Sequence, residues 1–282
     1  MQHPRRTTPT RTIAITGGKG GVGKTTIAVN LATALAARGR RTLLLDGDLG
    51  LANADIMLGV SPRYTLADVL GGRCTLESVT TATRFGFDLI PAATGIAQLA
   101  ALPETAHASI VQACSTLQRA FDDLIIDTAP GLGPSVLQLS QAAQQIVVVV
   151  CDEPTSLTDA YALIKVLANE RGVRRFRVLA NRVHGTAVGG KLFATLNAVA
   201  TRFLDVILEF AGEIPEDAQL RRAIRERHPV LAAFPESPAA RALKDFARRA
   251  DNWPVPAGPR GHIEFFAERL LPRPPIRLEV VR

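Results

Sequence analysis

The sequence predicts an α/β fold in which a mostly parallel sheet carries helices on both faces. Two observations lead to this prediction. From about residue 12 to residue 250, short apolar runs that suit buried strands alternate with longer runs of helical periodicity. Glycines or aspartates directly follow several apolar runs, and the ligand-binding residues of parallel sheets lie at that end of the strands. Strands that alternate with helices form parallel sheets, because each connection crosses over one face.

Local patterns place the individual elements. Strands are predicted at 12–16, 42–45, 124–126, 146–150 and 206–210, and within FDLIPAATG and FRVLANRVHG. Helices are predicted at 24–38, around TLADVL and TLESV, at 104–120, from Thr155 or Ser156 onward, and from a Ser237 cap with Pro238 at the first helical position to about Ala250. Asp152 and Glu153 are expected in a solvated loop, with contact to a second subunit as the alternative.

Composition narrows the class of protein. Hydrophobic residues make up 47% and charged residues 21% of the chain, which is typical of a globular protein and argues against wholesale disorder. The three cysteines lie far apart without a C-x-x-C pair, which argues against disulfides, a zinc site or an iron–sulfur scaffold. The formal net charge of +7 favours acidic surfaces such as nucleic acid or lipid headgroups, or reflects arginine used for solubility.

The two ends of the chain differ from the middle. Residues 1–11, MQHPRRTTPTR, are polar and basic without the apolar stretch of a signal peptide, so we expect a flexible segment and a cytoplasmic protein. The apolar run at 146–151 is too short to cross a bilayer. After residue 250 the composition shifts to proline, glycine and arginine. We therefore predict one domain over 12–250, followed by a linker and tail over 251–282.

A glycine-rich stretch, GGKGGVGKTT, occupies residues 17–26, between the first predicted strand and helix. From Gly18 to Thr25 it fits G-x-x-x-x-G-K-T, in which glycines let backbone N–H groups converge on phosphate oxygens at a helix N-terminus. Lys24 is expected to reach the outer phosphates and Thr25 to ligate Mg²⁺. The predicted ATP- or GTP-binding residues of this loop are Gly18, Lys19, Gly20, Gly21, Val22, Gly23, Lys24, Thr25 and Thr26.

Aspartates follow two further predicted strands. Asp46 and Asp48 come after the run at 42–45, and Asp127 comes after the run at 124–126. Because the carboxyl ends of parallel strands meet at one edge, these side chains should lie beside the glycine-rich loop. Carboxylates in that place can hold the water shell of Mg²⁺ and orient an attacking water. The sequence therefore predicts a site of nucleotide hydrolysis.

The loop contains a lysine in addition to Lys24, namely Lys19, and this residue points to a known family. Its KGGVGKTT form resembles the loop of the MinD/ParA superfamily of dimerising ATPases, which have the P-loop NTPase fold. The segment DGDLGLANADIMLGV at 46–60 is most similar to the FlhG/FleN branch, whose members control flagellar number and placement. The resemblance spans about residues 12–250. It implies that Lys19 reaches the nucleotide of a second subunit, that Asp48 activates water, and that Asp46 supports Mg²⁺ through water.

Two later segments are expected to bind the base. The superfamily reads adenine with an asparagine at the place of Asn181, next to Arg182, and an amide offers both a donor and an acceptor. The step I-P-E-D resembles the second adenine-side loop, which implicates Pro215, Glu216 and Asp217. These residues favour ATP over GTP.

The tail segment HIEFFAERLL, at 262–271, has an apolar face that includes Phe265 and Phe266. MinD-like relatives carry a short C-terminal amphipathic helix that binds membranes when ATP drives dimerisation, so the resemblance implies a weak, reversible membrane contact. Glu264 and Glu268 interrupt the face and favour packing against the body of the protein instead.

The implied function is an ATP- and Mg²⁺-dependent homodimeric switch with slow hydrolysis that regulates flagellar number or placement. The expected partner is a flagellar regulatory protein or a GTPase, although MQHPRRTTPTRTI shows no DQA-x-x-L activator element of the FlhG type. One alternative is a ParA-type ATPase that partitions DNA and binds it in a salt-dependent manner, with the arginines at 171, 174, 175 and 177 as a candidate surface. Another alternative is a scaffold that senses nucleotide without turnover.

Overall fold

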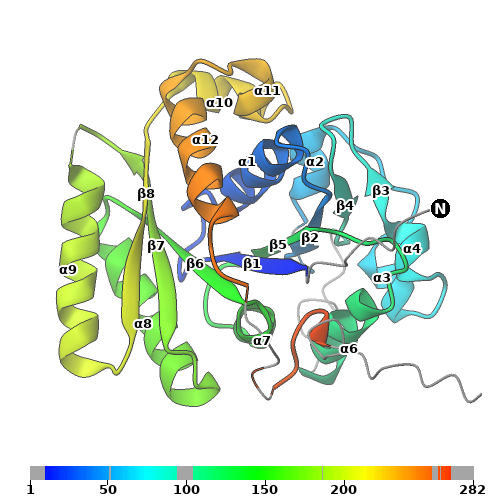
Figure 1. Ribbon diagram of the computed structural model, residues 1–282, viewed down its shortest axis with the longest axis horizontal. Coiled ribbons are helices and arrows are strands. Elements are labelled where there is room, and N and C mark those ends of the chain that lie inside the picture. Colours follow the sequence, from blue (N-terminus) through cyan, green and yellow to red (C-terminus); the bar gives the residue numbers. More distant parts are fainter. Residues whose placement is uncertain are drawn as a thin grey trace, which may run out of the picture.

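A computed structural model of the chain describes residues 10–50, 52–93, 104–185, 187–255, 260 and 262–267. The strands are β1 (Arg11–Thr16), β2 (Thr42–Gly47), β3 (Thr81–Ala82), β4 (Asp88–Ile90), β5 (Asp123–Thr128), β6 (Gln145–Cys151), β7 (Arg175–Val183) and β8 (Ile207–Pro215). They form one sheet in the order β3-β4-β2-β5-β1-β6-β7-β8 (Figure 1). Every neighbouring pair is parallel except β3 and β4. The predicted α/β fold with a mostly parallel sheet is confirmed.

Helices cover both faces of the sheet (Figure 1). They are α1 (Lys24–Ala37), α2 (Ala54–Leu58), α3 (Leu66–Leu70), α4 (Leu76–Val79), α6 (Glu104–Ser115), α7 (Pro134–Ala142), α8 (Pro154–Arg171), α9 (Val188–Phe203), α10 (Ala218–Arg225), α11 (Val230–Ala233) and α12 (Pro238–Asp251). Helix α6 ends five residues before the predicted end, and α8 begins one residue before the predicted start. Pro154 suits the first helical position because its missing N–H would have no intrahelical partner there.

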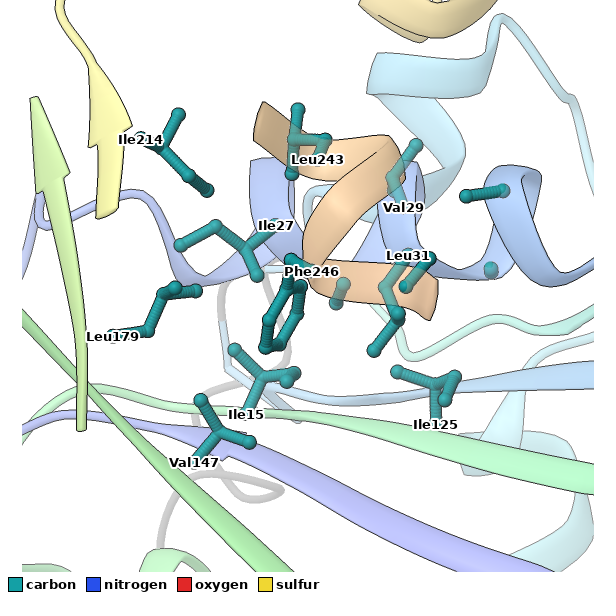
Figure 2. Packing of buried hydrophobic residues seen from close by; sticks show 14 of the residues in the cluster. Ile15, Ile27, Val29, Leu31, Ile125, Val147, Leu179, Ile214, Leu243 and Phe246 are labelled. Carbon is teal, nitrogen blue, oxygen red and sulfur yellow. The ribbon is translucent and has the colours of Figure 1, made fainter. Parts of the chain in front are cut away.

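The central strands are buried along their whole length, because both faces of the sheet are covered. Successive side chains of β1 point to opposite faces: Ile15 packs beneath α1 and α12, whereas Ala14 packs in the cluster on the other face. Leu243 and Phe246 of α12 lie with Ile27 of α1 above Ile15 (Figure 2). As predicted, Ser237 caps α12, and its hydroxyl accepts a hydrogen bond from the N–H of Ala240 at 3.1 Å.

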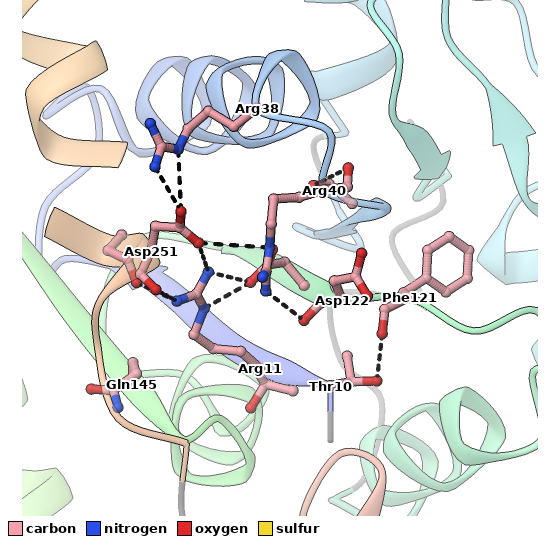
Figure 3. A network of polar contacts seen from close by, with 12 residues as sticks. Thr10, Arg11, Arg38, Arg40, Phe121, Asp122, Gln145 and Asp251 are labelled. Atoms are coloured by element: carbon pink, nitrogen blue, oxygen red, sulfur yellow. Dashed lines mark hydrogen bonds and ion pairs between the residues drawn. The ribbon is translucent and has the colours of Figure 1, made fainter. Parts of the chain in front are cut away.

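A buried ion network closes the amino end of the central strands (Figure 3). Arg11 Nε donates to Asp123 Oδ1 at 2.7 Å, and Arg40 Nε donates to Asp123 Oδ2 at 2.7 Å. Arg11 also donates to the backbone carbonyls of Ala250 and Asp251, which are the last carbonyls of α12. Arg11 was expected in the flexible N-terminal segment, and that boundary is wrong, because its guanidinium is the buried partner of Asp123. Residues 1–9 lie outside the described part.

The segment after α12 docks onto the opposite face of the sheet. Phe265 and Phe266 are completely buried in the core cluster that contains residues of α6 and α7. Arg260 donates to the carbonyls of Gln141 and Ala143 at the end of α7. Residues 262–266 are not helical and form a turn at Phe265 and Phe266, while Ala267 is helical. The alternative of packing against the body is therefore observed for these residues, and residues 268–271 lie outside the described part.

None of the helices in the described ranges is both long and apolar enough to cross a membrane.

Candidate nucleotide-binding site

The glycine-rich loop joins β1 to α1, at the carboxyl edge of the sheet between β5 and β6. Gly21 and Gly23 have φ angles of 79° and 94°, in the left-handed region that side chains disfavour. A Cβ atom at Gly18 would overlap the backbone carbonyl of Asp159 in α8, and one at Gly23 would overlap the amide of Asn181. Close packing against two neighbouring elements therefore explains why this loop needs glycine.

A cavity of about 410 Å³ opens over this loop. Lys24 begins α1 and is only 7% exposed, and its Nζ donates to the carbonyl of Lys19 at 3.1 Å, across the loop. The N-terminus of α1 adds free N–H groups and a positive dipole end, which suit phosphate. The residues that line the cavity are Gly20, Gly21, Gly23, Lys24, Thr25, Thr26, Asp48, Asn53, Thr128 and Pro130.

Asp46 and Asp127 are neighbours at the ends of β2 and β5, and each is 1% exposed. Asp46 accepts hydrogen bonds from the N–H groups of Asp48, Asn53 and Ala54 at 3.1 Å each. Burial raises the pKa of Asp46 to about 7 even though these N–H groups lower it. Burial and the nearby Asp46 raise the pKa of Asp127 well above its usual value. Two buried carboxyl groups side by side need a cation before both can ionise.

The side chains expected to hold Mg²⁺ do converge. The Thr25 hydroxyl hydrogen-bonds to Asp127, while Asp127 Oδ1 has no hydrogen-bond partner within the described residues. Burial lowers the pKa of Lys24, and the nearby Asp127 and Asp48 oppose that shift. Oxygen donors around one unpartnered buried carboxylate oxygen form a set that fits a hard divalent cation with its waters.

Lys19 does not line the phosphate cavity in the single chain and instead contacts the start of α8. Its Nζ donates to Glu153 Oε2 at 2.5 Å and to Thr155 Oγ1 at 2.9 Å. Both side chains of the ion pair are partly exposed, at 36% for Lys19 and 45% for Glu153. Glu153 was expected in a solvated loop, and it indeed lies in the loop before α8, where it is the ionic partner of the loop lysine.

The residues predicted for the base form a group beside the loop, outside the lining of the cavity. The side chain of Asn181 contacts the loop, because its Nδ2 donates to the carbonyl of Val22 at 2.8 Å. Its Oδ1 is buried and has no partner among the described residues. Arg182 is exposed and pairs with Glu216 at 3.2 Å. Pro215 ends β8, next to Glu216.

Asp217 has a structural role in this arrangement. Its carboxylate accepts from the N–H of Gln219 at 2.8 Å, which caps α10, and from the N–H of Ala239 at 3.0 Å, in the first turn of α12. Both carboxylate oxygens already accept hydrogen bonds at helix N-termini, and contact with the base through the side chain or the backbone of Asp217 stays a prediction.

Three cavity residues carried no predicted chemistry: Asn53, Thr128 and Pro130. They stand within the segments DGDLGLANAD and DTAPG, which had been noted for their aspartates and for their resemblance. The signal available for them was position alone, since Thr128 ends β5, Pro130 lies just after it, and Asn53 lies in the segment after β2.

Comparison with known proteins agrees with this geometry. Residues 13–230 match the model of the CobQ/CobB/MinD/ParA nucleotide binding domain. The chain is 52% identical to the antiactivator FleN of Pseudomonas aeruginosa, over 94% of this chain and 95% of that protein. It is 29% identical to the flagellum site-determining protein YlxH of Helicobacter pylori, over 84% of this chain and 81% of that protein.

Solved structures show the same arrangement of elements. The septum site-determining protein MinD of Pyrococcus horikoshii, complexed with Mg-ADP, has a TM-score of 0.71 at 30% identity, over 86% of this chain and 96% of that chain. The MinC:MinD cell division complex of Aquifex aeolicus has a TM-score of 0.70 at 29% identity, over 87% of this chain and 98% of that chain.

Proposed function

Because the chain belongs to the CobQ/CobB/MinD/ParA family of nucleotide-binding domains, we propose that it is an ATP-driven switch that regulates flagellar number and placement. The observation that carries the nucleotide part is the convergence of Lys24, Thr25 and Asp48 on one glycine-lined cavity, with the buried Asp127 hydrogen-bonded to Thr25. The flagellar part rests on the similarity to FleN and YlxH.

The proposed roles follow from position. Backbone N–H groups of the loop and the N-terminus of α1 bind the phosphates, and Lys24 faces their outer oxygens. Thr25 ligates Mg²⁺, while Asp46 and Asp127 hold its water shell. The bound cation neutralises charge that develops on the transferred phosphoryl group. Asp48, which lines the cavity and is partly exposed, orients the attacking water.

The base is proposed to lie beside Asn181. The unpartnered Oδ1 of Asn181 is an acceptor that suits the exocyclic amino group of adenine, which guanine lacks at that position. Arg182, Pro215 and Glu216 would border the base, and Asp217 would contribute through its backbone. This arrangement favours ATP over GTP.

Slow hydrolysis coupled to dimerisation completes the proposal. Two subunits would close face to face on ATP and Mg²⁺, with Lys19 of each reaching the nucleotide of the other. A flagellar regulatory protein or a GTPase would bind the closed dimer. A membrane contact through 262–271 would first require Phe265 and Phe266 to leave the core.

The candidate surface for DNA partitioning is smaller than the sequence suggests. Arg177 is 5% exposed, and Glu209 accepts from both Arg175 and Arg177. Buried Arg177 is therefore withdrawn from the candidate surface, and the Glu209 carboxylate offsets one of its positive charges, which leaves less free positive charge for phosphate contacts.

Light scattering tests the dimerising switch. The hydrolysis-blocked variant Asp48→Ala with ATP and Mg²⁺ is expected to double in mass, whereas the same variant with ADP stays a monomer. A monomer under both conditions would overturn the switch. For the flagellar role, the host strain without this gene should change its flagellar number, as counted by electron microscopy, and wild type but not Lys24→Ala should restore it.

A further inference from the structure

The phosphate-loop lysine that the dimer requires is already engaged in the single chain. Lys19 Nζ donates to Glu153 Oε2 at 2.5 Å and to Thr155 Oγ1 at 2.9 Å. The two acceptors stand at the start of α8, 134 and 136 residues further along the chain. Within its own subunit the ammonium group thus has a carboxylate and a hydroxyl to hold it.

The β6–α8 corner that presents Glu153 is firmly positioned. The N–H of Cys151 donates to Ser156 Oγ at 2.9 Å, and the N–H of Glu153 donates to the carbonyl of Cys151 at 2.8 Å. The N–H of Ser156 donates to the carbonyl of Glu153 at 2.9 Å. On the other side, Gly18 touches the backbone of Asp159 so closely that no side chain would fit. The loop and the start of α8 therefore form one rigid unit, and little ordering is needed to form the Lys19–Glu153 pair.

Among the described residues, Lys19 forms an ion pair with the Glu153 carboxylate. Glu153 occupies the N-cap position of α8, but its side chain makes no capping hydrogen bond. The hydrogen bond from Lys19, followed by the charge of Lys19, lowers the pKa of Glu153. The carboxylate is thus available to Lys19 in its charged form.

We propose that Glu153 retains Lys19 within its own subunit, and that this pair must open before Lys19 can reach the nucleotide of a second copy. The inference rests on the proposed function, because it assigns a regulator to the same dimerising site. Glu153 acts through Lys19 and touches no phosphate, so it is a positioning residue that raises the threshold for dimerisation.

The expected effect is moderate, because both partners are partly exposed. Ion pairs of this kind change an equilibrium by about twofold to fivefold. A dimer opens one pair in each subunit, so loss of Glu153 should lower the midpoint of dimerisation by about fourfold to twenty-five-fold. Salt screens the pair and should reduce the difference.

The pair itself is tested without nucleotide. Lysines of the full chain are acylated with limiting reagent and quantified by mass spectrometry, with the exposed Lys165 as internal reference. Lys19 of Glu153→Gln should react at least about twice as fast as Lys19 of wild type. The control Asp152→Asn removes the adjacent exposed carboxylate and should leave the rate unchanged. Equal rates for Glu153→Gln and wild type would overturn the proposal.

The consequence is tested by dimerisation. On the Asp48→Ala background with ATP and Mg²⁺, Glu153→Gln should dimerise at a lower protein concentration than its parent, and Asp152→Asn at the same concentration. An unchanged or higher midpoint for Glu153→Gln would show that the pair does not oppose dimerisation, and the proposal would fall. A parent that stays monomeric contradicts the proposed function instead, and the labelling rates then decide on the pair alone.

Discussion

At the scale of single residues, the candidate site collects groups that weaken the fold when it is empty. Asp46 and Asp127 are two buried carboxyl groups at neighbouring strand ends, and Lys24 is a buried ammonium. Burial opposes the charge of each group, which is why the pKa values of the aspartates are raised and that of Lys24 is lowered. We infer that these groups serve ligand binding, because apolar residues in their place would destabilise the fold less.

One prediction concerns Asp127. Asp127→Asn keeps the shape and an acceptor for Thr25 but removes one of the crowded negative charges. The free energy of unfolding of the nucleotide-free protein should rise by about 1 kcal/mol, measured by urea titration. The Mg²⁺-dependent part of the affinity for a fluorescent ATP analogue should fall at least tenfold. The exposed Asp205 supplies the control: Asp205→Asn should change neither quantity. Undiminished Mg²⁺ dependence in Asp127→Asn would contradict the proposed metal site.

A second prediction concerns Gly23. Gly23→Ala places a Cβ at a φ of 94°, against the amide of Asn181, so it should cost more than the about 1–2 kcal/mol of left-handed strain alone. Gly20→Ala is the matched control, because Gly20 is exposed and its Cβ would meet only Pro130 at 4.0 Å. Urea unfolding should separate the two variants by at least about 1 kcal/mol. Equal costs would show that the contact with Asn181 does not constrain the loop.

At the scale of elements, the site depends on where strands end and helices begin. The strands β1, β2 and β5 deliver the loop, Asp46 and Asp127 to one edge, because all three run parallel with these residues at their carboxyl ends. Helices α1 and α8 begin at the same edge and supply Lys24 and Glu153. The segment 262–267 packs on α7, as the acidic residues of its apolar face favoured over membrane contact.

The docking of that segment yields a third prediction. Phe265→Ala removes a side chain with 0% exposure and should reduce the free energy of unfolding by about 3–5 kcal/mol. Ile263→Ala changes a side chain in the same segment that is 52% exposed, so its cost should stay within about 0.5 kcal/mol. Chemical denaturation of both variants measures the difference. A small cost for Phe265→Ala would mean that the segment is not docked in solution.

At the scale of the whole molecule, opposite edges of the sheet have different tasks. The carboxyl edge carries the nucleotide site, and the amino edge carries the ion network of Arg11, Arg40, Asp123 and Asp251 (Figure 3). The network joins β1 and β5 to the ends of α1 and α12, and so connects the first and last elements of the domain. The stabilising ion network and the candidate nucleotide site therefore lie at opposite ends of the strands.

This separation leads to a fourth prediction. Arg11→Ala removes one of the two guanidinium partners of the fully buried Asp123, while Arg40 stays on the other oxygen, and should destabilise the fold by about 1–3 kcal/mol. The double variant Arg11→Leu with Asp123→Leu should cost less than Arg11→Ala, because no buried charge remains uncompensated. Affinity for the nucleotide should be unchanged in both variants, as measured by calorimetry on the folded protein. A large loss of affinity would show that the two edges are coupled.

The sequence by itself determined the order of the elements, the nature of the loop and the identity of its acidic partners. These features are local: a run of apolar residues, a glycine spacing or an aspartate after a strand is visible within about ten residues. The boundaries of β2 and β5 were less accurate, because Asp46 and Asp127 continue the pairing of buried strands although their side chains are polar.

Only the tertiary structure decided which distant groups meet. Glu153 pairs with Lys19 across 134 residues, and Asp123 pairs with Arg11 across 112. The spacing of Phe265 and Phe266 left membrane contact and packing against the body as alternatives, and in the structure both side chains are buried in the cluster that contains residues of α6 and α7. Likewise Asp217 lies in a segment that resembles the adenine-side loop, and its carboxylate caps α10 and accepts from the first turn of α12. In each case the partner is chosen by how strands and helices pack, and local periodicity carries no information about that choice.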